Sequence, residues 1–472
     1  MTKRRILLKI EIFVIIFAVI LSSVTFVMNE KTNNPPTIST FYKEPNNSLD
    51  VVFLGSSHML HAAYPMQLYN DFGIASHNYS QYGQPFYLTY ESFKEILKYQ
   101  KPKIAVIDIM TISWLFEPNW QSALHNIIDA IPFSLSKFFF INNFFYDSID
   151  SKNNVNLFNS YFPIYLYHSK WNILQKKDFS LIKNYSKGVT WGYNNFSGNK
   201  PNILSISNRL TLNDEMRENL DKIIKVAKKE NISLIFTVIP YDKSYMNIEK
   251  AQKYYNEVYW LTKSEKNIEY LNYFHNLDEI NFNFTYDLID DDHLNYYGAQ
   301  KITAHLGKYI KEHYDIPDRR LDPAYAKWND DYKLYVQDTF AQELNATKNS
   351  EKYLELLTSK KEATDNTCIF VVKTSEKNIN SKHFNSLGIN VNTNNCIAII
   401  DEGKVVYNRT ASDVPLQHKY KIGRLPVKLV SDVKGKNSSI KVDGIEQIKN
   451  KSGITIVIYD KLLKKVSSVR SL

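Results

Sequence analysis

The sequence predicts an α/β protein in which a parallel sheet is flanked by helices, with a transmembrane helix before it and a mainly-β domain after it. Three observations lead to this prediction. Residues 1–30 contain one long apolar run. Residues 49–320 alternate short apolar runs with amphipathic segments, which is typical of strand–helix units. Residues 345–472 hold several short β-like runs with glycines near the turns between them.

The N-terminal run predicts where the protein is located. Basic residues at positions 3–5 precede a stretch from Ile12 to Met28 that is apolar except for two serines and a threonine. About 20 apolar residues span a bilayer core, and a positive flank stays in the cytoplasm. No small-x-small cleavage site follows, which favours an uncleaved anchor over a signal peptide. We expect a single-pass protein of the cell membrane with a cytoplasmic N-terminus and an extracytoplasmic main body.

Two segments are expected to be linkers. Residues 31–48 are rich in prolines and polar residues, which predicts an extended tether that keeps the main domain close to the membrane. Residues 316–345 mark a junction, because the composition changes after them.

The charge of the chain limits its partners. A net charge of +9 favours anionic partners such as teichoic acids, acidic glycans or lipid headgroups. No nucleic-acid-binding motif accompanies this charge, so we do not expect nucleic acid as a partner. The 33 tyrosines suit contact with sugar polymers, and the base composition of the genome is an equally open explanation.

The main domain reads as alternating strands and helices. The expected strands cover residues 51–54, 76–78, 104–108, 232–239 and 268–271, and the expected helices cover about 87–99, 213–229, 248–263 and 297–313. Ligands of parallel sheets bind beyond the carboxyl ends of the strands. Polar residues and glycines that follow the predicted strands are therefore expected to meet at one edge. They are Ser57, Gly83, Asp108 and His293.

The first predicted strand runs directly into a turn that contains serine. Gly55, Ser56 and Ser57 follow the apolar run 51–54. A serine on the sharp turn after a buried strand presents its hydroxyl at the sheet edge, where α/β hydrolytic enzymes place their nucleophile. So short a motif is more often only a turn, and the prediction needs a base elsewhere in the chain.

A candidate base lies before the last predicted helix of the main domain, where Asp290 stands three residues ahead of His293. A nucleophilic serine needs a base to take its proton, and the base needs an acceptor that orients its ring. A solvated acidic turn that caps the helix is the alternative. Calcium binding by residues 290–292 is disfavoured, because the spaced ligands and the glycine of an EF-hand are missing. We expect no metal and no cofactor.

Together these segments resemble the SGNH/GDSL hydrolase family over roughly residues 48–315. The Gly-Ser-Ser turn stands where that family has its Gly-Asp-Ser block, with Ser57 at the nucleophile position. Residues 290–298, which read D-x-x-H-L-N-x-x-G, are similar to the closing block of the family. The resemblance implies an SGNH-type sheet and a catalytic triad of Ser57, His293 and Asp290.

Two further blocks of the family concern the oxyanion hole. Residues 78–83, N-Y-S-Q-Y-G, are similar to the second block, which implies that the backbone N–H groups of Gly83 and Ser57 bind the oxyanion beside Asn78. The third block, Gly-x-Asn-Asp, is not visible. The strand 104–107 is followed instead by Asp108 and Ile-Met-Thr, so the expected side-chain amide donor is missing and Asp108 stands near its place.

Loss of the third block is a habit of one branch of the family, the membrane-anchored proteins that move acyl groups onto cell-surface polymers. Teichoic-acid D-alanyl transfer and alginate O-acetylation proteins belong to it. The resemblance implies transfer of an acetyl or D-alanyl group, through an acyl-serine, to an anionic or neutral polysaccharide or to teichoic acid. It also implies a multi-spanning membrane-bound O-acyltransferase as the partner that supplies the acyl group. A carbohydrate esterase and a non-catalytic, membrane-anchored glycan-binding protein remain the alternatives.

Residues 111–211 are a long insertion rich in aromatic residues. A hundred residues exceed an ordinary strand-to-helix connection. We expect a helical cap over the site that lines an acceptor groove or rests on the membrane surface, and a buried subdomain core is the equally open alternative. His168, in the run Y-L-Y-H-S-K-W, is a candidate for substrate contact, although a satisfied core histidine is the more common role.

Residues 345–472 predict a helix at 350–359 followed by a small β-sandwich. The runs near 439–444 and 453–460 loosely resemble an interleukin-like β-domain, which implies a carbohydrate-binding or interaction role. Cys368 and Cys396 both lie here, and a disulfide and two separate buried thiols are equally open. Two cysteines without nearby paired histidines do not form a zinc site.

Overall fold

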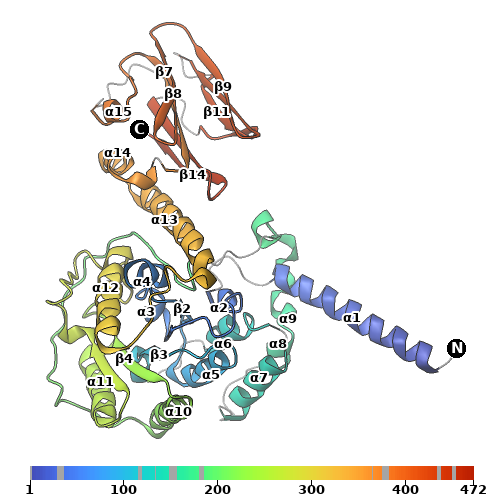
Figure 1. Cartoon of the computed structure of the whole chain (residues 1–472), viewed down its shortest axis with the longest axis vertical. Coiled ribbons are helices and arrows are strands. Elements are labelled where there is room, and N and C mark those ends of the chain that lie inside the picture. Colours follow the sequence, from blue (N-terminus) through green and yellow to red (C-terminus); the bar gives the residue numbers. More distant parts are fainter. Residues whose placement is uncertain are drawn as a thin grey trace. The chain divides into compact units, whose positions relative to one another are not determined.

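The computed structural model describes residues 3–28, 37–114, 120–132, 134–147, 157–179, 185–363, 365–374, 382–432, 437–448 and 453–472. The chain divides into two compact units, Met1–Trp328 and Asn329–Leu472. Unit 1 contains an N-terminal helix and a parallel sheet flanked by helices, and unit 2 contains antiparallel sheets (Figure 1). The division falls within the junction predicted from the sequence.

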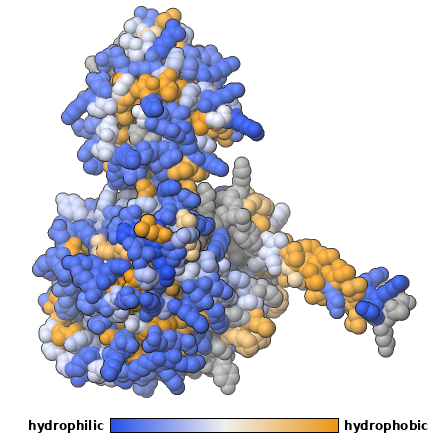
Figure 2. All heavy atoms as spheres, viewed as in Figure 1, coloured by the Kyte–Doolittle hydropathy of each residue, from blue (hydrophilic) through white to orange (hydrophobic). Residues whose placement is uncertain are grey.

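Helix α1 (Lys3–Met28) is one uninterrupted helix of 26 residues. Its segment Arg4–Thr25 is long and apolar enough to cross a membrane, and none of it is buried inside the structure. At 1.5 Å per residue its 22 residues span about 33 Å, close to the thickness of a bilayer core. Figure 2 shows α1 as a hydrophobic helix with hydrophilic residues toward its free end. Such a helix fits a membrane anchor or a signal sequence.

The segment predicted to be an extended tether is partly folded onto unit 1. Helix α2 (Thr37–Phe41) buries Ile38 and Phe41, which lie one helical turn apart. The ring of Phe41 packs against His77 with a centroid distance of 5.6 Å and against Tyr79 at 5.0 Å. The stretch between α1 and α2 is therefore much shorter than the predicted tether.

Unit 1 is built around five parallel strands in the order β2-β1-β3-β4-β5. They are β1 (Val51–Leu54), β2 (Ser76–Asn78), β3 (Ile104–Asp108), β4 (Ser233–Val238) and β5 (Ile268–Asn272). Every residue of β1 and β3 is buried, which explains why both strands read as continuous apolar runs. Val52 lies opposite His77 of β2 on one side and Ala105 of β3 on the other.

The strand order reverses at β1. The chain goes from β1 outward to β2 and then crosses back to β3 on the other side of β1. In open parallel sheets, ligands bind outside the carboxyl ends of the strands at such a reversal. Ser57, just after β1, and Asp108, at the end of β3, flank this point.

Helices of unit 1 pack in pairs along the sheet. Helix α4 (Pro65–Phe72) contacts α12 (Tyr296–His313), and α5 (Phe86–Leu97) contacts α10 (Asp214–Glu230). The sheet layers also contain α3 (Ser57–Leu60), which is a single turn, and the longer helix α11 (Ile248–Thr262). The predicted strands and helices of this domain are confirmed, with ends shifted by one or two residues.

The insertion 111–211 forms short helices where it is described. They are α6 (Trp120–Ile128), α7 (Leu135–Asp147), α8 (Leu157–Tyr161) and α9 (Ile164–Tyr167), with 3-10 turns η1 (Met110–Ser113), η2 (His168–Asn172) and η3 (Lys176–Phe179). Helix α7 contacts α5, α6 and α8, which connects the insertion to the helical layer of the sheet.

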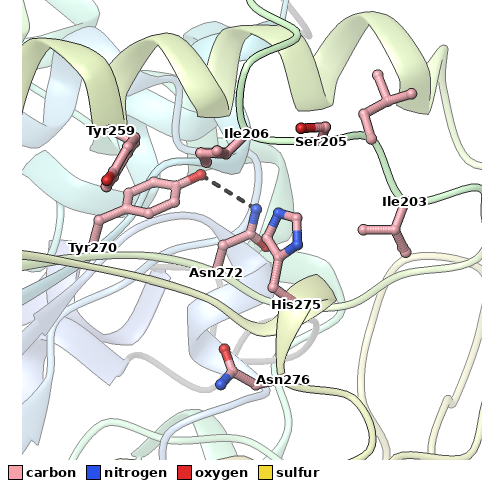
Figure 3. Close-up of a pocket in the computed structure, with 9 residues that line it drawn as sticks. Ile203, Ser205, Ile206, Tyr259, Tyr270, Asn272, His275 and Asn276 are labelled. Carbon is pink, nitrogen blue, oxygen red and sulfur yellow. Dashed lines mark hydrogen bonds between the residues drawn. The ribbon is translucent and has the colours of Figure 1, made fainter.

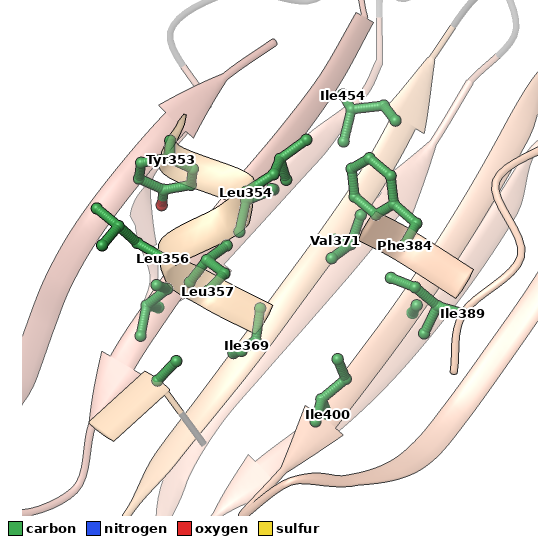
Figure 4. Close-up of a cluster of buried hydrophobic side chains, with 14 of the residues drawn as sticks. Tyr353, Leu354, Leu356, Leu357, Ile369, Val371, Phe384, Ile389, Ile400 and Ile454 are labelled. Carbon is green, nitrogen blue, oxygen red and sulfur yellow. The ribbon is translucent and has the colours of Figure 1, made fainter. Parts of the chain in front are cut away.

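Unit 2 consists of two antiparallel sheets with helices against one of them. The sheets have the orders β14-β13-β6-β7-β8 and β12-β11-β10-β9. Their strands are β6 (Thr367–Thr374), β7 (Asn395–Asp401), β8 (Lys404–Ala411), β9 (Leu416–Ile422), β10 (Leu425–Ser431), β11 (Ser439–Val442), β12 (Ile445–Glu446), β13 (Gly453–Asp460) and β14 (Lys465–Ser471). The helices are α13 (Ala326–Ala346), α14 (Ser350–Ser359) and α15 (Lys382–Ser386). In Figure 4, Leu354 and Leu357 of α14 lie with Ile369 and Val371 of β6 in one buried cluster.

The two cysteines of unit 2 are free and buried. Cys368 belongs to the core between the two sheets, whereas Cys396 belongs to the core under α14. The two side chains therefore point to opposite faces of the same sheet, which rules out a disulfide between them in this fold. Of the two alternatives left open by the sequence, separate buried thiols are the one observed.

Candidate active site

The turn after β1 is shaped by Gly55. Its φ of +153° is rarely adopted by residues with a side chain, and an added Cβ would lie 2.9 Å from Asp108 Cβ. The chain can therefore pass from the buried strand into α3 at this point only with glycine. Ser56 caps α3, since its hydroxyl accepts a hydrogen bond from His58 N–H at 3.4 Å. Ser57 is the first residue of α3 and is 7 % exposed.

The loop after β2 is held against this turn by backbone hydrogen bonds. Gln81 N–H donates to Gly55 C=O at 3.2 Å, and the chain then turns through Gly83, whose φ is +66°. Asn78 is fully buried, and its amide donates to the carbonyls of Met59 at 2.8 Å and Ala63 at 3.2 Å. The side chain of Asn78 therefore fastens the end of β2 to the chain around α3.

The loop that carries the candidate base is fixed by the remaining residues of its motif. Asn295 caps α12, because its side-chain oxygen accepts from Tyr297 and Gly298 N–H at 3.1 Å each. Its amide nitrogen donates back to the Tyr286 carbonyl at 2.6 Å. A Cβ on Gly298 would lie 2.3 Å from Asp287 O, so only glycine lets α12 approach this loop so closely.

His293 is oriented by two carboxylates. Its Nδ1 lies 2.9 Å from Asp290 Oδ1 and 2.9 Å from Asp292 Oδ1. Asp290 also accepts from the backbone N–H of His293 at 2.7 Å, so it holds both the ring and the chain. The other ring nitrogen, Nε2, is buried and makes no hydrogen bond in this structure, with Ser57 or any other described residue.

The ring of His293 lies over α3. Its centroid is 4.8 Å from that of His61 and 6.2 Å from that of His58, while Tyr82 is 6.4 Å away. His58 belongs to α3, the helix that begins at Ser57, and His61 follows its end. The fold thus brings together two segments that are more than two hundred residues apart in the sequence.

Electrostatics around His293 favour its charged form. Burial lowers its pKa, but hydrogen bonds with Asp290 and Asp292 and their negative charges outweigh burial and raise the pKa to about 9. Burial opposes ionisation of Asp290 too, yet its contacts with His293 hold its pKa below the ordinary value. At neutral pH His293 is mostly protonated, and the fraction able to act as a base grows as the pH rises.

A second pair of titratable groups is buried beneath the turn. Asp108 Oδ2 lies 3.9 Å from His58 Nδ1, and both side chains are fully buried. Burial raises the pKa of Asp108 to about 8, and burial together with the nearby His293 charge lowers the pKa of His58. Both groups are therefore mainly neutral at pH 7. In this protonated state the Asp108 carboxyl is a hydrogen-bond donor as well as an acceptor.

His168 is placed apart from these groups. It is exposed on η2, and its described contacts are with Tyr165, whose carbonyl lies 2.6 Å from His168 Nδ1. Among the described residues, the structure thus groups Ser57, Asn78, Asp108, Asp290 and His293 at the carboxyl edge of the sheet, and the Gly83 turn is tied to the same edge.

Three residues of this site, Asp292, Tyr245 and His58, were not predicted from the sequence. Asp292 contacts His293, the Tyr245 hydroxyl hydrogen bonds with Asp292, and His58 Nδ1 lies 3.9 Å from Asp108 Oδ2 without a hydrogen bond between them. Asp292 directly precedes His293, and in an extended chain neighbouring side chains point to opposite sides. Only the tight loop turns both toward one point, so the sole signal in the sequence is the run of three aspartates.

The same cluster could hold a cation. One oxygen each of Asp290 and Asp292 and one nitrogen of His293 lie within 4.8 Å of one another. These are also the atoms that hydrogen bond to each other, so a metal ion would compete with the orientation of His293. Two of the three side chains are only partly buried.

Comparisons with known proteins add little to these observations. Neither a family model nor a curated protein matches the chain. Among solved structures, the chain is similar to a protein from Streptococcus pneumonia provisionally described as a platelet activating factor. The two share 12 % identity at a TM-score of 0.30, over 66 % of this chain and all of the other. A likeness this distant carries no conclusion about function.

Proposed function

We propose that this protein is an SGNH-type serine acyltransferase, anchored in the cell membrane by α1 and active on the extracytoplasmic side. The observation that carries the proposal is the geometry of His293. Its Nδ1 is held by Asp290 at 2.9 Å, its Nε2 is buried without a partner, and its ring packs over α3, which begins at Ser57. A base oriented from one nitrogen and open at the other is what a serine nucleophile requires.

In the proposed reaction Ser57 Oγ attacks the carbonyl carbon of an acyl donor, and its proton passes to His293 Nε2. The oxyanion is stabilised by the backbone N–H groups of Ser57 and Gly83, each worth roughly 3–4 kcal/mol when well aimed. His293 then gives the proton to the leaving group, and an acyl-Ser57 ester remains. An acceptor hydroxyl attacks this ester, its proton passes to His293, and Ser57 regains a proton as the acyl group leaves. Asp290 keeps the ring of His293 in one orientation throughout.

The proposed acceptor is a cell-surface polysaccharide, and unit 1 has a pocket of about 610 Å³ at the carboxyl end of β5, three strands along the sheet from β1, in which part of a long polymer can bind. Its lining residues, most of them visible in Figure 3, are Ile203, Leu204, Ser205, Ile206, Tyr259, Tyr270, Asn272, His275 and Asn276. Tyrosine rings can stack on the apolar faces of sugars, and amide and imidazole groups can bond to their hydroxyls. Lysine, arginine and carboxylates are missing from the described lining residues, which favours a neutral sugar over the anionic polymer suggested by the net charge.

One wall of this pocket, formed by residues 203–206, is held in place by side-chain hydrogen bonds from α11. Gln252, Asn256 and Trp260, which follow one another at four-residue spacing along α11, all hydrogen bond with backbone groups of residues 202–208. Such a stripe holds an irregular segment in one shape, so a bound sugar would not have to order it.

The acyl donor is proposed to come from a multi-spanning membrane-bound O-acyltransferase, as the family resemblance implies. With water as acceptor the same residues would give an esterase, and the relative rates of transfer and hydrolysis decide between the two. If Ser57 cannot be acylated, a glycan-binding protein becomes the better description.

The test is intact mass spectrometry of the full chain in detergent after incubation with a small activated acetyl ester, beside Ser57→Ala. The proposal expects a gain of one acetyl group in the unsubstituted protein and none in Ser57→Ala. Addition of a neutral oligosaccharide should then discharge the adduct faster than water does. Absence of both an adduct and ester turnover in the unsubstituted protein would refute a serine acyl-transfer mechanism.

A further inference from the structure

Exposed hydrophobic side chains in unit 1 gather in α1 and in the described parts of the insertion, residues 135–147 and 157–179. The most exposed outside α1 include Leu135, Phe158, Tyr165, Trp171, Ile173 and Phe179, each between 54 % and 77 % exposed. Single exposed hydrophobic residues are normal on a protein surface, but a dense group of aromatic and aliphatic side chains marks an interaction site.

We call these side chains the aromatic face: the exposed hydrophobic residues among 135–147 and 157–179, in α7, α8, α9, η2, η3 and the residues between them. Ring centroids of Phe158 lie 4.9 Å from Phe162 and 5.8 Å from Tyr165. Phe138 of α7 lies 5.6 Å from Tyr161 of α8. Helix α8 also contacts α9, and α9 contacts η2, so the face is continuous from α7 to η2, and η3 joins it beside α1.

The aromatic face is next to the apolar N-terminal helix. Helix α1 contacts α9, η2 and η3, the last elements of the face. Figure 1 shows α7, α8 and α9 together on the side of unit 1 from which α1 leaves. The apolar surface of α1 therefore continues into the aromatic face.

The chain length between α1 and the body of unit 1 limits how far the body can lie from a membrane. Helix α1 ends at Met28 and α2 begins at Thr37, and α2 is packed into unit 1. The connection can span at most about 30 Å, because each residue extends the chain by less than 3.6 Å. If α1 crosses the bilayer, unit 1 is held within about 30 Å of the membrane surface, and the contacts of α1 with α9, η2 and η3 place the aromatic face on the side nearest to it.

We propose that the aromatic face lies in the interfacial region of the bilayer that α1 crosses, so that unit 1 is attached to the membrane at two places. The proposal rests on α1 being retained as an anchor, as in the proposed function, but not on the chemistry of Ser57. Tryptophan and tyrosine favour the headgroup level, and phenylalanine, leucine and isoleucine favour the acyl boundary below it. Lys170, whose Nζ lies 5.4 Å from the Tyr167 ring centroid, supplies a positive charge at the level where lipid phosphates lie.

A lipid surface fits this face better than a sugar chain does. Aromatic residues that bind sugars have amides or carboxylates beside them for the hydroxyl groups, as in the pocket lined by Tyr270 and Asn272. Apolar side chains dominate the aromatic face: its most exposed members are mainly phenylalanine, leucine, isoleucine and tryptophan, and Asn172 and Gln175 add exposed amides near η2. Attachment at two places would fix which side of the sheet faces the membrane, whereas a single tether would leave it free to turn.

The test places a fluorescent label at single cysteines in the full chain, reconstituted in nanodiscs of neutral and anionic phospholipids. Phe158→Cys and Trp171→Cys lie on the aromatic face, and Tyr286→Cys is the matched control, an exposed aromatic residue elsewhere in unit 1 at 63 % exposure. The native cysteines are buried, so the unsubstituted protein should take up no label and serves as the blank.

Labels at positions 158 and 171 are expected to be quenched by lipids with brominated acyl chains and to be at least about fivefold less accessible to iodide than the label at 286. Equal iodide quenching at all three positions would overturn the proposal. Protection from iodide without quenching by brominated lipids would also overturn it, because a protein would then cover the face. Repeating the measurement in Ser57→Ala should give the same result, which keeps this outcome separate from that of the acylation test.

Discussion

The two carboxylates on His293 should have different effects when each is replaced by its amide. Together they raise the pKa of His293 from 6.5 to about 9 against the opposing effect of burial. This change in pKa corresponds to a stabilisation of the protonated ring by roughly 3 kcal/mol, since a change of one in pKa equals about 1.4 kcal/mol. In His293, Asp292 contacts the ring alone, whereas Asp290 contacts the ring and also accepts from the backbone N–H; Asp292 has a further hydrogen bond with the Tyr245 hydroxyl. We therefore expect Asp292→Asn mainly to change the pKa and Asp290→Asn mainly to disturb the orientation.

The assay is the rate of Ser57 acylation by an activated ester, measured between pH 5 and pH 10. A general base acts in its neutral form, so the rate should rise with pH and reach half its maximum near the His293 pKa of about 9. Asp292→Asn removes one of two similar contacts and should move this midpoint down by about one pH unit, with a maximal rate within about tenfold of normal. Asp290→Asn should lower the maximal rate by about a hundredfold or more.

The reasoning would be refuted if Asp292→Asn left the midpoint unchanged, because its charge would then not act on His293. It would be refuted equally if Asp290→Asn reacted at the normal maximal rate. Asp291→Asn is the matched control: its backbone carbonyl accepts from Asp242 N–H at 2.8 Å, and substitution of its side chain leaves that bond in place. This variant should show the normal profile.

Three other predictions concern single residues. Burial raises the pKa of Asp108 to about 8, so the folded protein keeps a proton that the unfolded chain loses above about pH 4. The free energy of unfolding should therefore fall as the pH rises from 4 to 8. In thermal melts, the Tm of Asp108→Asn should fall less over this range than the Tm of the unsubstituted protein. Gly298→Ala should destabilise unit 1 by about 1–3 kcal/mol in a denaturant titration, because its Cβ would lie 2.3 Å from Asp287 O. Tyr270→Ala should weaken binding of a neutral oligosaccharide by about tenfold in a titration while acylation of Ser57 continues at the normal rate; unchanged affinity would exclude the pocket as the sugar site.

The strands of unit 2 show when a pattern of hydrophobic residues is enough to predict a strand and when it is not. Strands β6, β7 and β13 are buried on both faces and read as apolar runs, so they were predictable. In strand β9 only the first residue is buried, and the others alternate between exposed and partly buried and include two lysines. Such a strand contains no apolar run and is not predicted from one. The prediction of a helix at 350–359 followed by a small β-sandwich therefore matches α14 and the two sheets, but it omits β9, β10, β12 and β14 and the helices α13 and α15.

The sequence by itself determined the order of elements in unit 1, because buried parallel strands and amphipathic helices leave strong local patterns. It also pointed to Ser57, Asp290 and His293, since a strand-ending serine turn and a D-x-x-H loop are short motifs readable along the chain. It could not show that Asp292 turns toward His293, that His58 and Asp108 form a buried pair, or that Cys368 and Cys396 face apart. These contacts depend on loop conformation and on which face of a sheet each residue occupies. Such features are decided only when distant segments pack together.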